Sequence, residues 1–216
     1  MKEIILFTKG LVLIEAFAAI AGFATWRKWK GRFFQWFPVY MLLIVLLEML
    51  HLVFAQYNMY DAAAFMYDIA IPIEILFISW FFYWVLNPNS RKVTIAGAFS
   101  FAAAFTTEKF IMQQKGYFFQ SLSYTVGNLF ILLYLILFFI ELAKSDRLLH
   151  FKKLTVFWLG AGMLIFYLGT FPFYGLYNEL AKDIGLFIKI AWVATFLNYC
   201  MYLFFIIGFI WGKRDL

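Results

Sequence analysis

Seven apolar segments, separated by short polar connections, follow one another along almost the whole chain. They lie at about residues 4–25, 35–56, 62–86, 93–113, 119–143, 154–176 and 184–211. A helix needs about 20 mostly apolar residues to cross the hydrocarbon of a membrane, and only the fourth segment, rich in Ala and Gly, is short. That segment is expected to span with Glu108 and Lys109 at its end, or when packed among its neighbours. The sequence therefore predicts an all-α polytopic membrane protein, a seven-transmembrane-helix bundle.

The composition agrees with a membrane protein. Of the 216 residues, 65% are hydrophobic and 14% are charged, whereas a soluble domain is close to half apolar and about a quarter charged. The single cysteine, Cys200, excludes an intramolecular disulfide framework. No connection is long enough to fold separately, so residues 1–216 are expected to form a single transmembrane domain.

The basic residues predict the orientation of the chain. If the helices alternate in direction, twelve Lys and Arg residues fall on one side of the membrane and six on the other. The positive-inside rule then places the N-terminus outside and the C-terminus in the cytoplasm. Although the net charge is +6, these residues flank apolar segments, where they contact anionic lipid headgroups. We therefore expect membrane lipids as partners, and no nucleic acid.

Several polar side chains lie inside the apolar segments. A charged group in lipid is costly, so such residues are expected to face the bundle interior, to pair, or to be protonated. Counting inward along the helices places most of them between the outer surface and the middle of the membrane. The sequence therefore predicts a polar pocket in the outer half of the bundle. The candidate ligand- or ion-binding residues are Glu15, Glu48, His51, Asp68, Glu74, Asn128, Lys189 and Asn198.

Glu48 and His51 are three residues apart in "LLEMLHL" and share one helical face. A carboxyl group beside an imidazole can form a charge-assisted hydrogen bond, share a proton or supply two metal ligands. The pair is thus a candidate for ligand, proton or metal binding. The alternative is a polar contact that only holds two helices together.

Two prolines predict bends in transmembrane helices. Pro72 lies between Asp68 and Glu74, which are turned about 120° from each other on an ideal helix. Proline lacks an N–H and clashes with the carbonyl four residues earlier, so Pro72 and Pro172 should kink their helices and free polar backbone groups. Such groups are tolerated at membrane depth where they line a cavity or are packed within protein. The alternative is a kink kept for packing.

Lys189, in the last of seven segments, suggests a retinal protein. However, Leu168 and Phe171 precede Pro172 where a microbial rhodopsin would have Trp and Tyr, and Lys189 can extend to the membrane surface. Retinal is therefore not expected, and no cofactor is predicted. With two histidines, one of them (His150) in a connection, the chain lacks the usual ligand set of an intramembrane zinc hydrolase. We do not expect an enzyme.

Three tracts carry a resemblance to known proteins. "YDIAIPIEILFISWFFYWVL", "IFYLGTFPFYGLYN" and "LNYCMYLFFIIGFIWGK" are rich in aromatic residues and are spread along the chain. In these tracts the chain resembles a group of small uncharacterised bacterial seven-helix membrane proteins. The resemblance implies a multi-pass protein of the bacterial inner membrane and no particular activity.

The first functional prediction is a receptor-like or sensory role, with a small or lipidic ligand bound in the outer half of the bundle. Its output would pass to a separate cytoplasmic or membrane signalling partner through the basic loops, chiefly "KSDRLLHFKK". The second is a small proton- or cation-coupled transporter that uses the same carboxyl groups. The third is an accessory membrane subunit, in which the polar residues only hold helices together.

Overall fold

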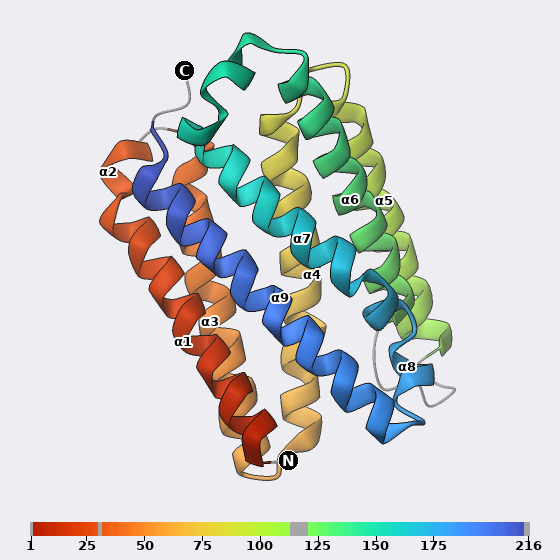
Figure 1. Cartoon of the computed structure of the whole chain (residues 1–216). Helices are drawn as coiled ribbons and strands as arrows, with labels where there is room; N and C mark the ends of the chain where they lie inside the picture. Colours follow the sequence, from red (N-terminus) through yellow and green to blue (C-terminus); the bar gives the residue numbers. More distant parts are fainter. Residues whose placement is uncertain (1, 30–31, 113–120, 214–216) are drawn as a thin grey trace. The chain divides into compact units, whose positions relative to one another are not determined.

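A computed structural model describes residues 2–29, 32–112 and 121–213 of the chain, which are built almost entirely of helices (Figure 1). Within these ranges Leu154 and Lys213 form an isolated bridge and no strand occurs. The predicted all-α class is confirmed. The helices are α1 (Lys2–Ala24), α2 (Trp26–Trp29), η1 (Phe33–Gln35), α3 (Trp36–Gln56), α4 (Tyr60–Val85), α5 (Arg91–Thr107), η2 (Glu108–Met112), α6 (Ser121–Ala143), η4 (Asp146–Lys153), α7 (Thr155–Gly175), α8 (Tyr177–Leu180) and α9 (Ile184–Trp211).

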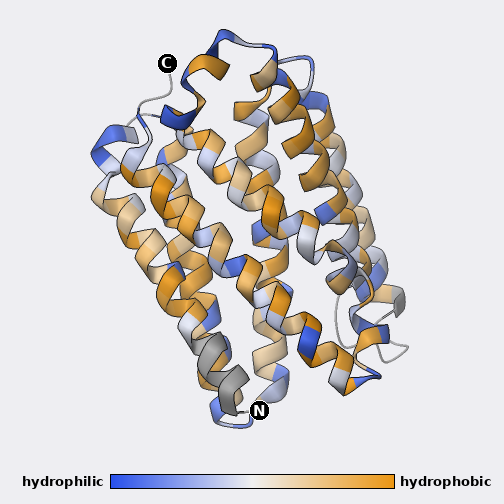
Figure 2. Ribbon diagram, viewed as in Figure 1, coloured by the Kyte–Doolittle hydropathy of each residue, from blue (hydrophilic) through white to orange (hydrophobic). Residues whose placement is uncertain are grey.

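The long helices are apolar enough for a membrane. In the part of the chain that the structure describes, five are long and apolar enough to span: η1 with α3 (Phe33–Gln56), α4, α6, α7 and α9. Figure 2 shows hydrophobic residues along these helices and hydrophilic residues in α2 and in the connection after α6. The protein is therefore a multi-pass membrane protein. Gly10–Ala24 is a shorter apolar helix and α5 has 17 residues, so the count of seven spans and the orientation of the termini stay predictions.

The chain divides into two compact units. Unit 1 comprises Met1–Glu74, His150–Gly162 and Asn198–Leu216, and unit 2 comprises Ile75–Leu149 and Met163–Leu197. Each of α4, α7 and α9 contributes residues to both units. That all 216 residues form one transmembrane domain stays a prediction.

In unit 1, α1 lies alongside α3 (Figure 1). A Cβ atom on Gly22 would lie 2.6 Å from Cγ of Pro38, so glycine allows the two backbones to approach closely. The ring of Phe37, on α3, lies 5.3 Å from that of Phe205 and 6.1 Å from that of Phe209. Phe37 is 1% exposed, so these rings form an aromatic core between α3 and the end of α9.

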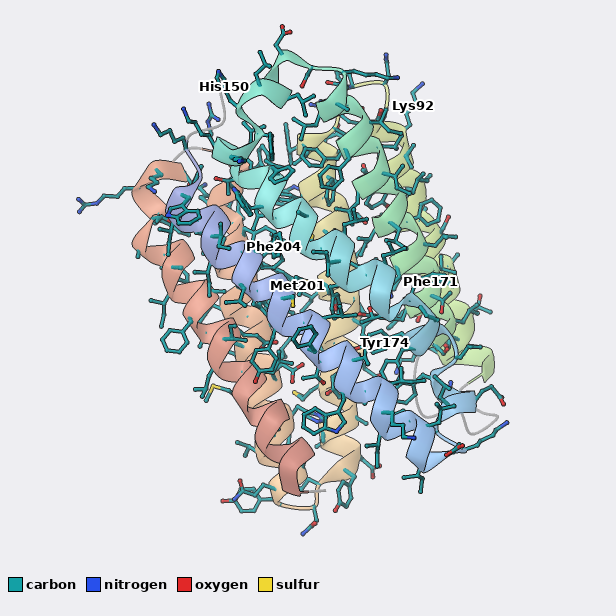
Figure 3. The ribbon with its side chains drawn as sticks, in the orientation of Figure 1. Lys92, His150, Phe171, Tyr174, Met201 and Phe204 are labelled. Carbon is teal, nitrogen blue, oxygen red and sulfur yellow. The ribbon has the colours of Figure 1, made fainter. Side chains whose placement is uncertain are left out.

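The first turns of α7 pack on the last turns of α9 in the same unit. The Thr155 hydroxyl donates a hydrogen bond to the Gly208 carbonyl at 3.2 Å. The Trp158 ring lies 5.8 Å from the ring of Phe204, which Figure 3 labels on α9 beside Met201. Met201 is 7% exposed, so this face of α9 is buried.

The connection between α3 and α4 is a Schellman turn. Asn58 has a φ of 58°, a left-handed conformation that asparagine tolerates better than most residues. Its N–H donates to the Ala55 carbonyl at 3.2 Å, and the Met59 N–H donates to the Phe54 carbonyl at 2.9 Å. These two bonds satisfy carbonyls that the end of α3 would otherwise leave free.

In unit 2, α5 and α6 are packed along each other (Figure 1). The Tyr134 hydroxyl donates to the Thr94 carbonyl at 3.3 Å and lies 3.4 Å from the Ser79 hydroxyl. A Cβ atom on Gly97 would collide with this tyrosine hydroxyl and would lie 2.8 Å from Cγ of Phe130. Glycine at position 97 is therefore required for the close approach of α5 to α6.

A buried carboxyl group caps the N-terminus of α6. Glu108, 5% exposed, accepts hydrogen bonds from the backbone N–H of Leu122 at 3.0 Å and of Ser123 at 2.8 Å. It also accepts one from the Ser123 hydroxyl at 2.6 Å. N–H groups of a first helical turn lack partners within the helix, and the helix dipole favours an anion there. Glu108 therefore joins the end of α5 to the start of α6.

The other end of the same pair is joined by a second carboxyl group. Glu141, near the end of α6, accepts hydrogen bonds from the backbone N–H of Asn87 at 3.0 Å and from the Ser90 hydroxyl at 2.5 Å. Asn87 and Ser90 lie just before α5. Each end of the α5–α6 pair thus has a glutamate that accepts hydrogen bonds from the neighbouring element.

Candidate functional site

Glu15 is an acidic residue within the apolar part of α1, and it is 2% exposed. Ala18 and Ala19 follow it by about one helical turn, and they are 0% and 3% exposed. Small residues let helices pack closely, so this face of α1 is covered by protein in unit 1. The sequence therefore places a carboxyl group in a buried, apolar surrounding, where it requires polar partners.

The partners of Glu15 come from three other helices of unit 1. The Tyr202 side chain, on α9, is hydrogen-bonded to the Glu15 carboxyl group, and Glu48 on α3 and Glu74 on α4 are close enough to interact with it electrostatically. Tyr40, on α3, interacts in the same way with Glu15 and Glu74. Tyr202 interacts with all four of these residues. We call Glu15, Tyr40, Glu48, Glu74 and Tyr202 the acidic cluster.

Two buried oxygen atoms of unit 1 have no hydrogen-bond partner among the described residues: Oε2 of Glu15 and Oδ1 of Asn198. Asn198 is one helical turn before Tyr202 on α9, so the two residues share a face. Tyr199, next to Asn198, also interacts electrostatically with Glu15. The two unpaired acceptors thus lie on helices α1 and α9, where these helices meet around Glu15.

His51 links α3 to α4 beside the acidic cluster. Its Nδ1 atom lies 3.0 Å from the Ala63 carbonyl, and because a carbonyl only accepts, Nδ1 carries the hydrogen. The imidazole ring lies 4.5 Å from the ring of Tyr67, and His51 interacts electrostatically with Glu48. The residue therefore supports α4 next to a carboxyl group of the cluster.

Pro72, Pro172 and Asp68 are three further residues that the sequence singled out. Helix α4 continues through Pro72, and α7 ends at Gly175, three residues after Pro172. Asp68 is half-buried on the unit 1 part of α4. The predicted bends and the lining role of Asp68 stay predictions.

Asn128 and Lys189 belong to unit 2 and not to the unit that holds the acidic cluster. Asn128 is 0% exposed, and neither Oδ1 nor Nδ2 of its amide has a partner within the described residues. The Lys189 side chain is exposed. The sequence grouped these two residues with the carboxyl groups because all of them interrupt apolar segments.

Sequence reasoning missed Tyr40 and Tyr202. The chain has 13 tyrosines, so a single tyrosine in an apolar segment is not conspicuous. Spacing offers one signal, because Tyr202 is four residues after Asn198 and a buried tyrosine hydroxyl usually has a polar partner. The signal identifies a polar face on α9 but not its partner on α1.

The cluster is built from oxygen atoms on several helices. Among the described residues, no three side chains of His, Cys, Asp and Glu come together at a spacing that could hold a metal ion. The three carboxyl groups are thus close enough to interact but do not converge on one point. Such an arrangement can accept hydrogen bonds and favour a nearby positive charge.

Comparison of the chain with models of protein families, with curated proteins and with solved structures finds no match in any of the three.

Proposed function

We propose that this multi-pass membrane protein is receptor-like and binds a small, positively charged ligand at the acidic cluster. A signal would then pass to a separate partner. The observation that carries the proposal is the buried Oε2 atom of Glu15, which lacks a hydrogen-bond partner among the described residues, while the carboxyl groups of Glu48 and Glu74 are close enough to interact with it.

The energetics of burial support a ligand. A buried acceptor without a donor costs about 1–3 kcal/mol, and carboxyl groups that interact with each other within apolar helices add to that cost. A cation that brings a hydrogen-bond donor would remove both penalties, since it also supplies positive charge and displaces no existing partner of Oε2. Polar groups that are costly to the fold and remain buried are typical of functional sites.

Thermal unfolding of the purified protein in detergent tests the proposal, with sodium, magnesium, tetramethylammonium and putrescine as probes at constant ionic strength. A ligand present at 100 times its Kd stabilises the folded state by about 2.7 kcal/mol, or about 5–10 °C in Tm for a chain of this length. At least one cation should raise the Tm of the wild type and not that of Glu15→Gln. If no cation does so, the proposal is wrong.

A small proton- or cation-coupled transporter is the second candidate. Glu15 favours it because a buried carboxyl group that interacts with two others can bind and release a positive charge, as coupled transport requires. Reconstitution into liposomes separates the two candidates. A transporter should move the stabilising cation or protons across the bilayer and lose this flux on Glu74→Gln, whereas a receptor-like protein should bind the cation without flux.

A third outcome would favour an accessory subunit. If replacing all three glutamates by glutamine changes Tm but abolishes neither binding nor flux, the cluster only holds helices together. A matched control is Glu179→Gln, because Glu179 pairs with Lys182 at the surface, where the two side chains are 65% and 71% exposed.

A further inference from the structure

The two unpaired oxygens of unit 1 restrict the chemistry of the ligand. Oε2 of Glu15 and Oδ1 of Asn198 are both buried, and neither has a hydrogen-bond donor among the described residues. The amide oxygen of asparagine can only accept, and an ionised carboxyl group can only accept as well. A ligand that satisfies both atoms while Glu15 is ionised must therefore bring hydrogen-bond donors.

The two helices that carry these atoms pack against each other, since a Cβ atom on Gly10 of α1 would collide with the Tyr199 hydroxyl on α9. Tyr202 is hydrogen-bonded to Glu15, and Tyr199 interacts with Glu15 electrostatically. Asn198 is the residue before Tyr199 and lies one turn from Tyr202 on the same helical face. Tyr202 therefore lies beside both Glu15 and Asn198.

We propose that the ligand is a small protonated amine, whose N–H groups donate hydrogen bonds to Oε2 of Glu15 and Oδ1 of Asn198. This inference rests on the proposed function and names the class of cation. An alkylammonium group has a positive charge and up to three N–H donors, so one group can satisfy both oxygens. Glu48 and Glu74, which also interact with Glu15, favour an amine with more than one positive charge.

Two other classes of cation fit the same residues less well. A metal ion is usually bound by several ligands at short, fixed distances, and no such group of three exists among the described residues. A quaternary ammonium has the charge but no N–H, so both oxygens would stay without a donor. Its usual site is a cage of aromatic rings, whereas the unpaired atoms here are oxygens.

The first experiment compares putrescine with its bis-quaternary analogue, in which every N–H is replaced by N–CH₃. The two probes have the same charge and a similar separation of charges. Isothermal titration of the wild-type protein in detergent should give an affinity for putrescine at least about tenfold higher than for the analogue, since a hydrogen bond to a charged group is worth that much. Equal affinities would overturn the inference, as would tighter binding of magnesium than of putrescine.

The second experiment removes one acceptor. Asn198→Leu should weaken putrescine binding about tenfold or more and leave the Tm without ligand unchanged or higher, because the substitution removes a buried, unpaired oxygen. Asn128→Leu is the matched control: it removes an equally unpaired amide from unit 2 and should leave the affinity unchanged. Unchanged affinity in Asn198→Leu, or the same loss in both variants, contradicts the proposal.

These measurements distinguish a failure of the proposed function from a failure of the amine as its ligand. If no cation stabilises the protein, the proposed function is wrong, and the inference that the ligand is an amine is then wrong as well. If sodium, magnesium or the bis-quaternary compound binds through Glu15 as well as putrescine does, the proposed function stands and the amine is wrong. Should Asn198→Leu not fold, the comparison of the two probes on the wild type still decides.

Discussion

Replacement of Glu108 by alanine should destabilise the protein more than any surface change of the same size. The carboxyl group is 5% exposed and accepts three hydrogen bonds, from two backbone N–H groups in the first turn of α6 and from the Ser123 hydroxyl. Ser123 is itself 0% exposed, so water cannot easily replace the lost acceptor. The variant leaves buried donors without a partner at a helix N-terminus.

The size of the effect follows from these contacts. Loss of an N-terminal capping acceptor costs about 0.5–2 kcal/mol, and a buried donor left unpaired costs about 1–3 kcal/mol. The favourable interaction of a carboxylate with the helix dipole, about 0.3–1 kcal/mol, is lost as well. We expect Glu108→Ala to lower the free energy of unfolding by about 3 kcal/mol. Glu108→Gln should lie between the alanine variant and the wild type, because its amide NH₂ cannot accept.

Denaturant unfolding in detergent, together with amide hydrogen exchange, measures the effect and locates it. Exchange of the Leu122 and Ser123 amides should accelerate in Glu108→Ala, while the amides in the middle of α6 change less. Glu179→Ala is the control, since its surface pair with Lys182 is worth a few tenths of a kcal/mol at most. The reasoning is refuted if Glu108→Ala unfolds within about 0.5 kcal/mol of the wild type or exchanges Leu122 and Ser123 at the wild-type rate.

Three further predictions concern the helix connections and contacts. Asn58→Gly should keep or slightly raise the Tm, whereas Asn58→Ala should cost about 1 kcal/mol because of its positive φ; equal Tm values in both variants would argue against the Schellman turn. Gly97→Ala should cost about 1–3 kcal/mol through its collision with Tyr134, and Tyr134→Phe in the same chain should recover part of the loss, or the collision is not the cause. Burial raises the pKa of Tyr177 above 10.0, so the folded state binds this proton more tightly and stability falls as the pH rises past 10.0; Tyr177→Phe should reduce this alkaline loss in unfolding measurements, and an unchanged pH profile would contradict it.

The helices could be predicted from the sequence because the apolar segments end at charged residues or at residues that favour turns. The segment 35–56 corresponds to η1 and α3, which end at Gln56 before the left-handed Asn58, and the segment 184–211 is α9 itself. The fourth segment shows the limit of the pattern. Its α-helix ends at Thr107 and continues as the π-helical turn η2. Glu108, the first residue of this turn, accepts hydrogen bonds from the start of α6, a contact that helical periodicity does not reveal.

Only part of the candidate site could be predicted from the sequence. Glu15, Glu48 and Glu74 were conspicuous because a carboxyl group in an apolar segment is costly, and the structure brings these three into interaction. The same reasoning also selected Asn128 and Lys189, which lie in the other unit. Periodicity gives the face of a helix but not the identity of the helix that covers it. The hydrogen bond between Glu15 and Tyr202, and the role of Glu108, therefore required three-dimensional information.

The glutamates at the two ends of the α5–α6 pair have a consequence for the biogenesis of the protein. With 17 residues, several of them Ala, Gly, Ser or Thr, α5 is a weak candidate for entering lipid alone. Glu108 and Glu141 tie it to α6, its more hydrophobic successor. We expect the translocon to release α5 into the bilayer only when α6 has been synthesised, so that both helices are inserted as a hairpin.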